Sequence, residues 1–167
     1  NVANGPIGGN IWVRAGKKGT GNVTMKNNYI KKSCHDETIA IFGTSASEEN
    51  FVDNVYIDNN TIEIDDTSVT NKSFPVINFG YTTDKITNIN FTNNNLTAKA
   101  GGRFITIYNA ENVLIANNTM NLTSIMYLDY MNWFEEDTNS INVRFEKNNI
   151  ELNAESSMYN RVFSNID

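Results

Sequence analysis

The stretch Asn54-Val-Tyr-Ile-Asp-Asn-Asn-Thr-Ile62 has four close counterparts elsewhere in the chain. Each of the five reads Asn, apolar, any residue, apolar, any residue, Asn (Lys once), Asn, any residue, apolar. Successive starts are 32, 34, 24 and 30 residues apart, at Asn22, Asn54, Asn88, Asn112 and Asn142. A repeat of this period predicts an architecture in which each unit packs on its neighbours.

Each unit predicts a strand, a turn and the start of a second short strand. Alternating apolar residues such as Val23 and Met25 indicate a strand with one apolar face. The Asn pair ends the strand, because Asn tolerates the left-handed backbone conformation and bonds to its own turn. If each unit is one coil stacked at about 4.8 Å, side-chain amides can bond along a column. The members of this column are Asn28, Asn60, Asn94, Asn118 and Asn148.

A second kind of strand recurs between the units, at 11–14, 38–42, 76–79, 104–108, 127–130 and 159–163. Its period-two alternation predicts two inward columns. One holds Ile39, Ile77, Ile105 and Leu128, and the other holds Ile41, Phe79, Ile107, Tyr130 and Val162. The outward column between them holds Trp12, Ala40, Asn78, Thr106, Asp129 and Arg161. The glycines at 43 and 80 favour a competing alignment that is shifted by one residue, and such a slip would exchange the two faces.

With the first alignment, the outward face is aromatic, and a contiguous aromatic patch marks a binding or packing site. Its members are Trp12, Phe42, Phe104, Tyr108, Tyr127, Tyr159 and Phe163. Such a face suits the apolar faces of sugar rings and suits a neighbouring subunit equally well. Cover by another part of the same polypeptide is the remaining alternative. The stretch 131–138 is interpreted as an aromatic and acidic loop insertion.

The Asn-ending strands with a variable loop in each coil resemble the right-handed parallel β-helices of the pectate-lyase-like superfamily. The resemblance covers roughly residues 8 to 165, and it implies an all-β fold of about five to six coils with no substantial helix. Residues 1–167 would then be a single β-helix segment that begins with a leading loop at 1–10. Because no amphipathic capping helix is visible at either end, we expect a fragment of a longer chain.

Within the superfamily, the region from Gly8 to Gly43, with its His-Asp-Glu-Thr-Ile-Ala-Ile-Phe-Gly run, looks most like phage tail or appendage proteins of Gram-positive hosts. This resemblance implies a homotrimer in a virion tail that contacts host cell-surface polysaccharide or teichoic acid. A secreted or cell-surface location is the alternative. The net charge of −6 argues against nucleic acid and anionic membranes as partners. No apolar run approaches the length of a membrane span, so no membrane insertion is expected.

Candidate catalytic residues are His35, Asp36 and Glu37, which form the sharpest polar cluster, and Asp129 on the outward face. Two carboxyl groups about 5 to 9.5 Å apart could hydrolyse a glycosidic bond. However, the Gly-His-Gly, Arg-Ile-Lys and Trp-Ile-Asp-His motifs of polygalacturonases and pectate lyases are absent. No catalytic residue is therefore carried over, and ordinary loop roles or an ion pair of Asp129 with Arg161 stay open. No cofactor is expected apart from calcium on loop carboxylates.

Three functions remain open on the basis of the sequence. The first is a tailspike or appendage segment that contacts host glycan. The second is a polysaccharide-depolymerising lyase or glycoside hydrolase of the same fold. The third is a structural spacer or assembly module of a virion or surface protein, in which the aromatic face is a subunit interface.

Overall fold

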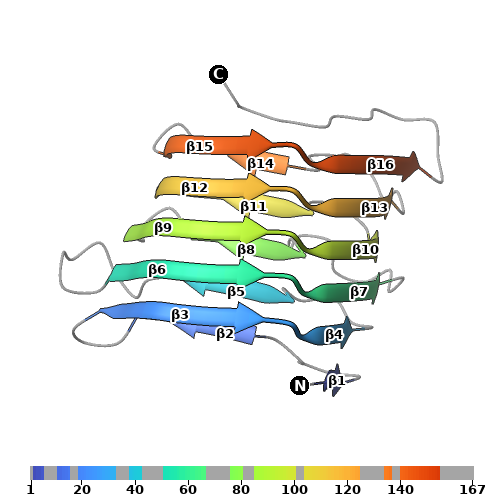
Figure 1. Ribbon diagram of the computed structural model, residues 1–167, viewed down its shortest axis with the longest axis horizontal. Helices are drawn as coiled ribbons and strands as arrows, with labels where there is room; N and C mark the ends of the chain where they lie inside the picture. Colours follow the sequence, from blue (N-terminus) through green and yellow to red (C-terminus); the bar gives the residue numbers. More distant parts are fainter. Residues whose placement is uncertain are drawn as a thin grey trace.

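The computed structural model describes residues 2–5, 11–15, 19–32, 38–42, 51–66, 76–80, 85–100, 104–124, 134–136 and 140–154. Over these ranges the chain is a parallel β-solenoid, and they contain no helix. Every strand pair is parallel, and Figure 1 shows the strands stacked along one axis in sequence order. The prediction of an all-β solenoid without helix is confirmed.

The described strands form three parallel sheets, which we name A, B and C (Figure 1). After β1 in sheet A, the chain passes through a strand of sheet B, then sheet C, then sheet A, and repeats this order. Sheet A contains β1 (Val2–Gly5), β4 (Tyr29–Lys32), β7 (Thr61–Asp66), β10 (Asn95–Ala100), β13 (Thr119–Ser124) and β16 (Asn149–Ala154). Sheet B contains β2 (Ile11–Arg14), β5 (Ile39–Phe42), β8 (Ile77–Phe79), β11 (Ile105–Ile107) and β14 (Phe134–Glu136). Sheet C contains β3 (Thr20–Lys26), β6 (Phe51–Asp58), β9 (Lys85–Thr92), β12 (Ala110–Ala116) and β15 (Ile141–Glu146).

The core consists of apolar rows that run across the strands on the inner faces of the sheets. In sheet C one row is Val23, Val55, Ile89, Val113 and Val143, and in sheet A one row is Ile30, Ile62, Leu96, Met120 and Ile150. In sheet B the register aligns the predicted inward columns, with Ile39, Ile77 and Ile105 in one and Ile41, Phe79 and Ile107 in the other, and all six are buried. The register therefore confirms that the members of each predicted column align across β5, β8 and β11.

The first Asn of each repeat lies inside a sheet C strand with a left-handed backbone. The five φ angles run from 53° at Asn54 to 58° at Asn112. This conformation shifts the alternation by one residue, as a β-bulge does. Val52 and Val55 are both fully buried, whereas the two residues between them, Asp53 and Asn54, are partly exposed. The kink thus places an additional polar residue of each repeat on the outer face of sheet C.

A second left-handed residue turns the chain from sheet C to sheet A. Asn27, Asn59, Asn93 and Asn117 occupy it in four repeats, and Lys147 occupies it in the fifth with φ 54°. Asn adopts this conformation readily, whereas other residues with a Cβ pay about 1–2 kcal/mol for it. Lys147 is therefore a strained position in an otherwise consistent turn.

We expect Lys147→Asn to raise the free energy of unfolding by about 0.5–1 kcal/mol, because it relieves part of this backbone strain. Urea denaturation would measure the change. The reciprocal variant Asn117→Lys, at the equivalent turn of the preceding repeat, should lower the free energy of unfolding by a similar amount. Two variants with unchanged stability would show that this turn does not distinguish the two residues.

Two predicted segments differ from the structure. Val2–Gly5, expected in a leading loop, forms β1 and pairs with β4. Phe134–Glu136, expected in a loop insertion, forms β14 and pairs with β11, so that Glu135 stands beside Thr106. The expected strand at 127–130 lies outside the described residues, and so does the one at 159–163.

Candidate functional site

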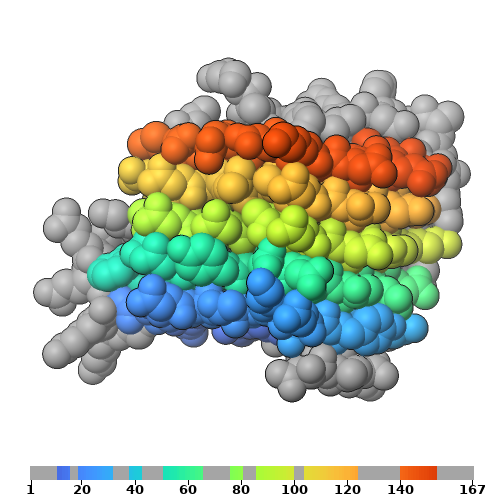
Figure 2. Space-filling model, viewed as in Figure 1, coloured from blue at the N-terminus to red at the C-terminus, as the bar shows by residue number. Residues whose placement is uncertain are grey.

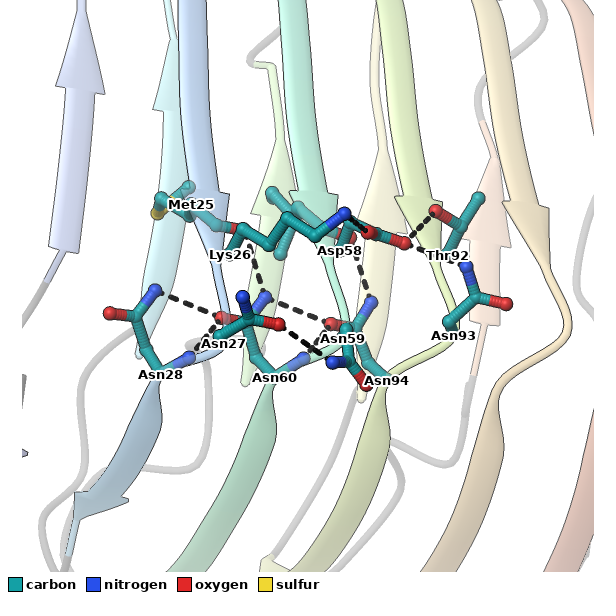
Figure 3. Close-up of polar contacts among 11 residues, drawn as sticks. Met25, Lys26, Asn27, Asn28, Asp58, Asn59, Asn60, Thr92, Asn93 and Asn94 are labelled. Carbon is teal, nitrogen blue, oxygen red and sulfur yellow. Dashed lines mark hydrogen bonds and ion pairs between the residues drawn. The ribbon is translucent and has the colours of Figure 1, made fainter.

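The second Asn of each pair forms a continuous hydrogen-bonded ladder in the turn between sheets C and A. Figure 3 shows its members Asn28, Asn60 and Asn94. Asn94 donates from its backbone N and from Nδ2 to Oδ1 of Asn118, at 2.8 and 3.1 Å. Its Nδ2 also donates to the carbonyl oxygen of Ile57 at 2.9 Å. Its Oδ1 accepts from the backbone N and Nδ2 of Asn60, at 2.9 and 3.0 Å. The same pattern joins the members Asn28, Asn60, Asn94, Asn118 and Asn148.

The ladder has an architectural role rather than a role in ligand contact. Asn60, Asn94 and Asn118 are almost completely buried. Their carboxamides are occupied by hydrogen bonds to one another and to backbone carbonyl groups. The ladder fixes the turn of each repeat and aligns the two sheets that flank it.

A line of polar contacts lies at the outer edge of the same turn, centred on Asp58 (Figure 3). Lys26 Nζ lies 2.9 Å from an Asp58 oxygen, and Asn93 and Thr92 donate to the carboxylate at 2.7 and 2.9 Å. The hydrogen bonds from Lys26 and then Asn93 lower the pKa of Asp58 most, burial opposes them, and the hydrogen bond from Thr92 adds a smaller lowering. Asp58 is therefore held as a carboxylate that cross-links neighbouring repeats.

The predicted aromatic face is not continuous on the described part of sheet B. Trp12 is 53% exposed on the edge strand β2 and contacts Phe42 edge-on, with ring centroids 5.6 Å apart. Arg14 lies over the Phe42 ring at 5.5 Å. Phe42 and Tyr108 are half-buried, and Phe104 is fully buried, so its assignment to an outer surface is wrong. Three further predicted members lie outside the described residues: Tyr127, Tyr159 and Phe163.

Burial on both faces explains this correction. The outward column of Ala40, Asn78 and Thr106 is buried as well, and Thr106 donates to Asn78 at 2.8 Å within it. Strands that are buried on both sides carry apolar or small residues at every position. Their alternation therefore cannot separate an outer face from an inner one.

The candidate catalytic residues His35, Asp36, Glu37 and Asp129 lie outside the described residues. In the register of sheet B, the place beside Thr106 that was assigned to Asp129 belongs to Glu135 of β14. Within the described ranges, no three His, Cys, Asp or Glu side chains come together to hold a metal ion. The described part of the chain also contains no helix able to span a membrane.

The described surface contains a groove of about 360 Å³ on the outer face of sheet C. Figure 2 shows this face as stacked bands that belong to β3, β6, β9, β12 and β15. Two parallel rows of side chains line the groove, and Val113 lies between them. The first row, which we call the amide row, is Asn54, Asn88, Asn112 and Asn142, and the second, which we call the mixed row, is Tyr56, Asn90, Leu114 and Arg144.

The amide row is a second, more exposed ladder. Asn142 Nδ2 donates to Asn112 Oδ1 at 2.7 Å, and Asn112 Nδ2 donates to Asn88 Oδ1 at 3.1 Å. At its end, Asn88 and Asn54 donate to the Asp53 carboxylate, each at 2.7 Å. These contacts hold the carboxamides at fixed positions along the groove.

The mixed row is in register across four neighbouring strands, because Tyr56 pairs with Asn90, Asn90 with Leu114, and Leu114 with Arg144. Tyr56 is 44% exposed, so its ring is available to a ligand. Arg144 Nη1 lies 3.2 Å from Glu146 Oε1, so the guanidinium has a carboxylate partner on the surface.

Chemically, the groove offers groups that can bind a polar ligand. Its lining residues contain no His, Cys, Asp or Glu that could act as general acid, base or nucleophile. Carboxamides, a phenol and a guanidinium donate and accept hydrogen bonds and offer one aromatic surface. This groove was not predicted from the sequence. Two features of the sequence indicated it: an Asn begins all five repeats, and the apolar residues Val52 and Val55 are three positions apart, which breaks the period of two.

Fold and groove together define the class of the protein: a parallel β-solenoid with an amide-lined groove across the strands of one sheet. No protein-family model, curated protein or solved structure matches the chain.

Proposed function

We propose that the chain is a β-solenoid segment of a phage tailspike or appendage protein that contacts a host cell-surface polysaccharide through the sheet C groove. The observation that carries this proposal is the groove itself, with carboxamides held in line on one side and the exposed ring of Tyr56 on the other. Hydroxyl groups of sugars exchange hydrogen bonds with amides, and aromatic rings pack against the apolar faces of sugars.

The remaining parts of this proposal come from the resemblance to the pectate-lyase-like superfamily. They are a right-handed solenoid of five to six coils, a homotrimer and a place in a virion tail. The groove moves the expected glycan contact from sheet B to sheet C. Because the lining residues contain no carboxylic acid, cleavage of the glycan is not part of the proposal at this groove.

Affinity electrophoresis on a panel of bacterial cell-wall and capsular polysaccharides tests the proposal. We expect at least one polymer to retain the protein, and Tyr56→Ala to weaken that binding about tenfold, which corresponds to roughly 1.4 kcal/mol. The matched control is Asn121→Ala on the exposed outer face of sheet A, which should bind as the original protein does. If no polymer of the panel retains the original protein, the glycan-contacting function is excluded for these polymers.

A further inference from the structure

We infer that the sheet C groove selects a neutral, hydroxyl-rich glycan lying along the solenoid axis, and that it disfavours polyanions such as poly(glycerol phosphate) teichoic acid. This inference rests on the proposed glycan-contacting function and narrows its ligand class. Three features of the groove lead to it: the direction of its rows, the hydrogen-bonding capacity of its carboxamides, and the charges around it.

The direction of the groove follows from strand register. The four members of the mixed row come from β6, β9, β12 and β15 and stand opposite one another in the ladder pairing. A row of this kind crosses the strands and follows the stacking axis. Three strand spacings give a length of roughly 14 Å, which suits a short run of sugar rings in an extended chain. A ligand laid along the axis meets one equivalent carboxamide per repeat.

The hydrogen-bonding capacity of the amide row suits hydroxyl groups. An Asn side chain offers two N–H donors and two acceptor lone pairs. Within the row, Asn112 uses one donor toward Asn88 and one lone pair toward Asn142. One donor and one acceptor of Asn112 thus remain for a ligand. A hydroxyl group uses both, whereas an ionised phosphate only accepts hydrogen bonds and leaves the acceptor to water.

The charges around the groove oppose a polyanion. Arg144 is the cationic residue of the lining, and Glu146 already pairs with it at 3.2 Å. Asp53 accepts hydrogen bonds from the amide row at the other end, and Glu111 is exposed beside Asn112. The whole chain carries a net charge of −6. A phosphate polymer would therefore meet carboxylates along the groove and would have one partly neutralised guanidinium to bind.

The polymers that test the inference are the neutral polysaccharides of the panel and purified poly(glycerol phosphate) wall teichoic acid, each at about 50 and about 300 mM NaCl, a range over which exposed charges become strongly screened. We expect a neutral polymer to bind at least about tenfold more tightly than the teichoic acid, with little change between the two salt concentrations. Asn90→Ala and Asn112→Gly should each weaken neutral binding about fivefold to tenfold. Glycine suits position 112 because that backbone is left-handed, with φ 58°.

A charge variant sharpens the test. Glu146→Gln frees Arg144 from its carboxylate partner, so teichoic acid binding should strengthen while neutral binding stays unchanged. If the original protein prefers teichoic acid, with an affinity that falls steeply with salt and is lost in Arg144→Ala, the inference is wrong while the glycan-contacting function stands. If neither polymer class binds, the proposed function itself fails and the inference falls with it.

Discussion

Asn94→Ala is expected to lower the free energy of unfolding by about 2–4 kcal/mol. The Asn94 side chain is almost completely buried and takes part in four hydrogen bonds of the ladder in the turn between sheets C and A, which we call the inner ladder. Its removal leaves the backbone N–H of Asn60 without its acceptor, and a buried polar group in that state costs about 1–3 kcal/mol. The loss of the donor to the Ile57 carbonyl adds a second cost of the same kind.

Urea denaturation, followed by circular dichroism, would measure this loss. Asn95→Ala is the matched control, because Asn95 is the exposed next residue, in β10, and should change stability by no more than about 0.5 kcal/mol. Asn94→Asp keeps the acceptor but removes both Nδ2 donors, so it should also be destabilising. Equal stability of Asn94→Ala and Asn95→Ala would mean that the inner ladder does not hold the repeats together.

The parallel solenoid could be predicted because its determinants are local and repeated. One unit contains the apolar alternation of Val55 and Ile57, the left-handed Asn59 and the inward Ile62, each of which acts within a few residues. Five copies with similar spacing leave parallel stacking as the arrangement that aligns the apolar positions. The short strand after each Asn pair, predicted from Ile62 and its equivalents, is present in sheet A as β4, β7, β10, β13 and β16.

The outer surfaces could not be predicted to the same extent, because they depend on what covers each face. Phe104 and Thr106 were both assigned to the outer face of the sheet B stack, and both are fully buried. Alternation alone places them in solvent. The leading asparagines show a different limit: counting by two from the inward Val55 turns Val52 outward and Asp53 inward, whereas the left-handed Asn54 leaves Val52 buried and Asp53 partly exposed. A kink of this kind changes the face of every earlier residue in its strand.

Gly80→Ala is expected to lower the free energy of unfolding by about 3–5 kcal/mol, or to prevent accumulation of folded protein. Gly80 has φ +86°, a conformation in which a Cβ is strained. An added Cβ would also overlap the backbone carbonyl oxygen of Tyr108 and lie 3.2 Å from the Ile86 side chain. The backbone cannot easily retreat, because Gly80 N donates to the Ile41 carbonyl at 2.7 Å and Tyr108 N donates to the Phe79 carbonyl at 2.8 Å.

Gly21→Ala provides the matched control for this variant. Gly21 lies in β3, and a Cβ added there would be 3.5 Å from the Asp53 carbonyl oxygen, an ordinary contact distance. We expect its stability to stay within about 1 kcal/mol of the original, since the lower entropy of the unfolded chain offsets part of any cost. Thermal unfolding of the two variants side by side would measure the difference. If both melt together, the close approach of β8 and β11 at Gly80 is not required for the solenoid, and sheet B tolerates a wider spacing there.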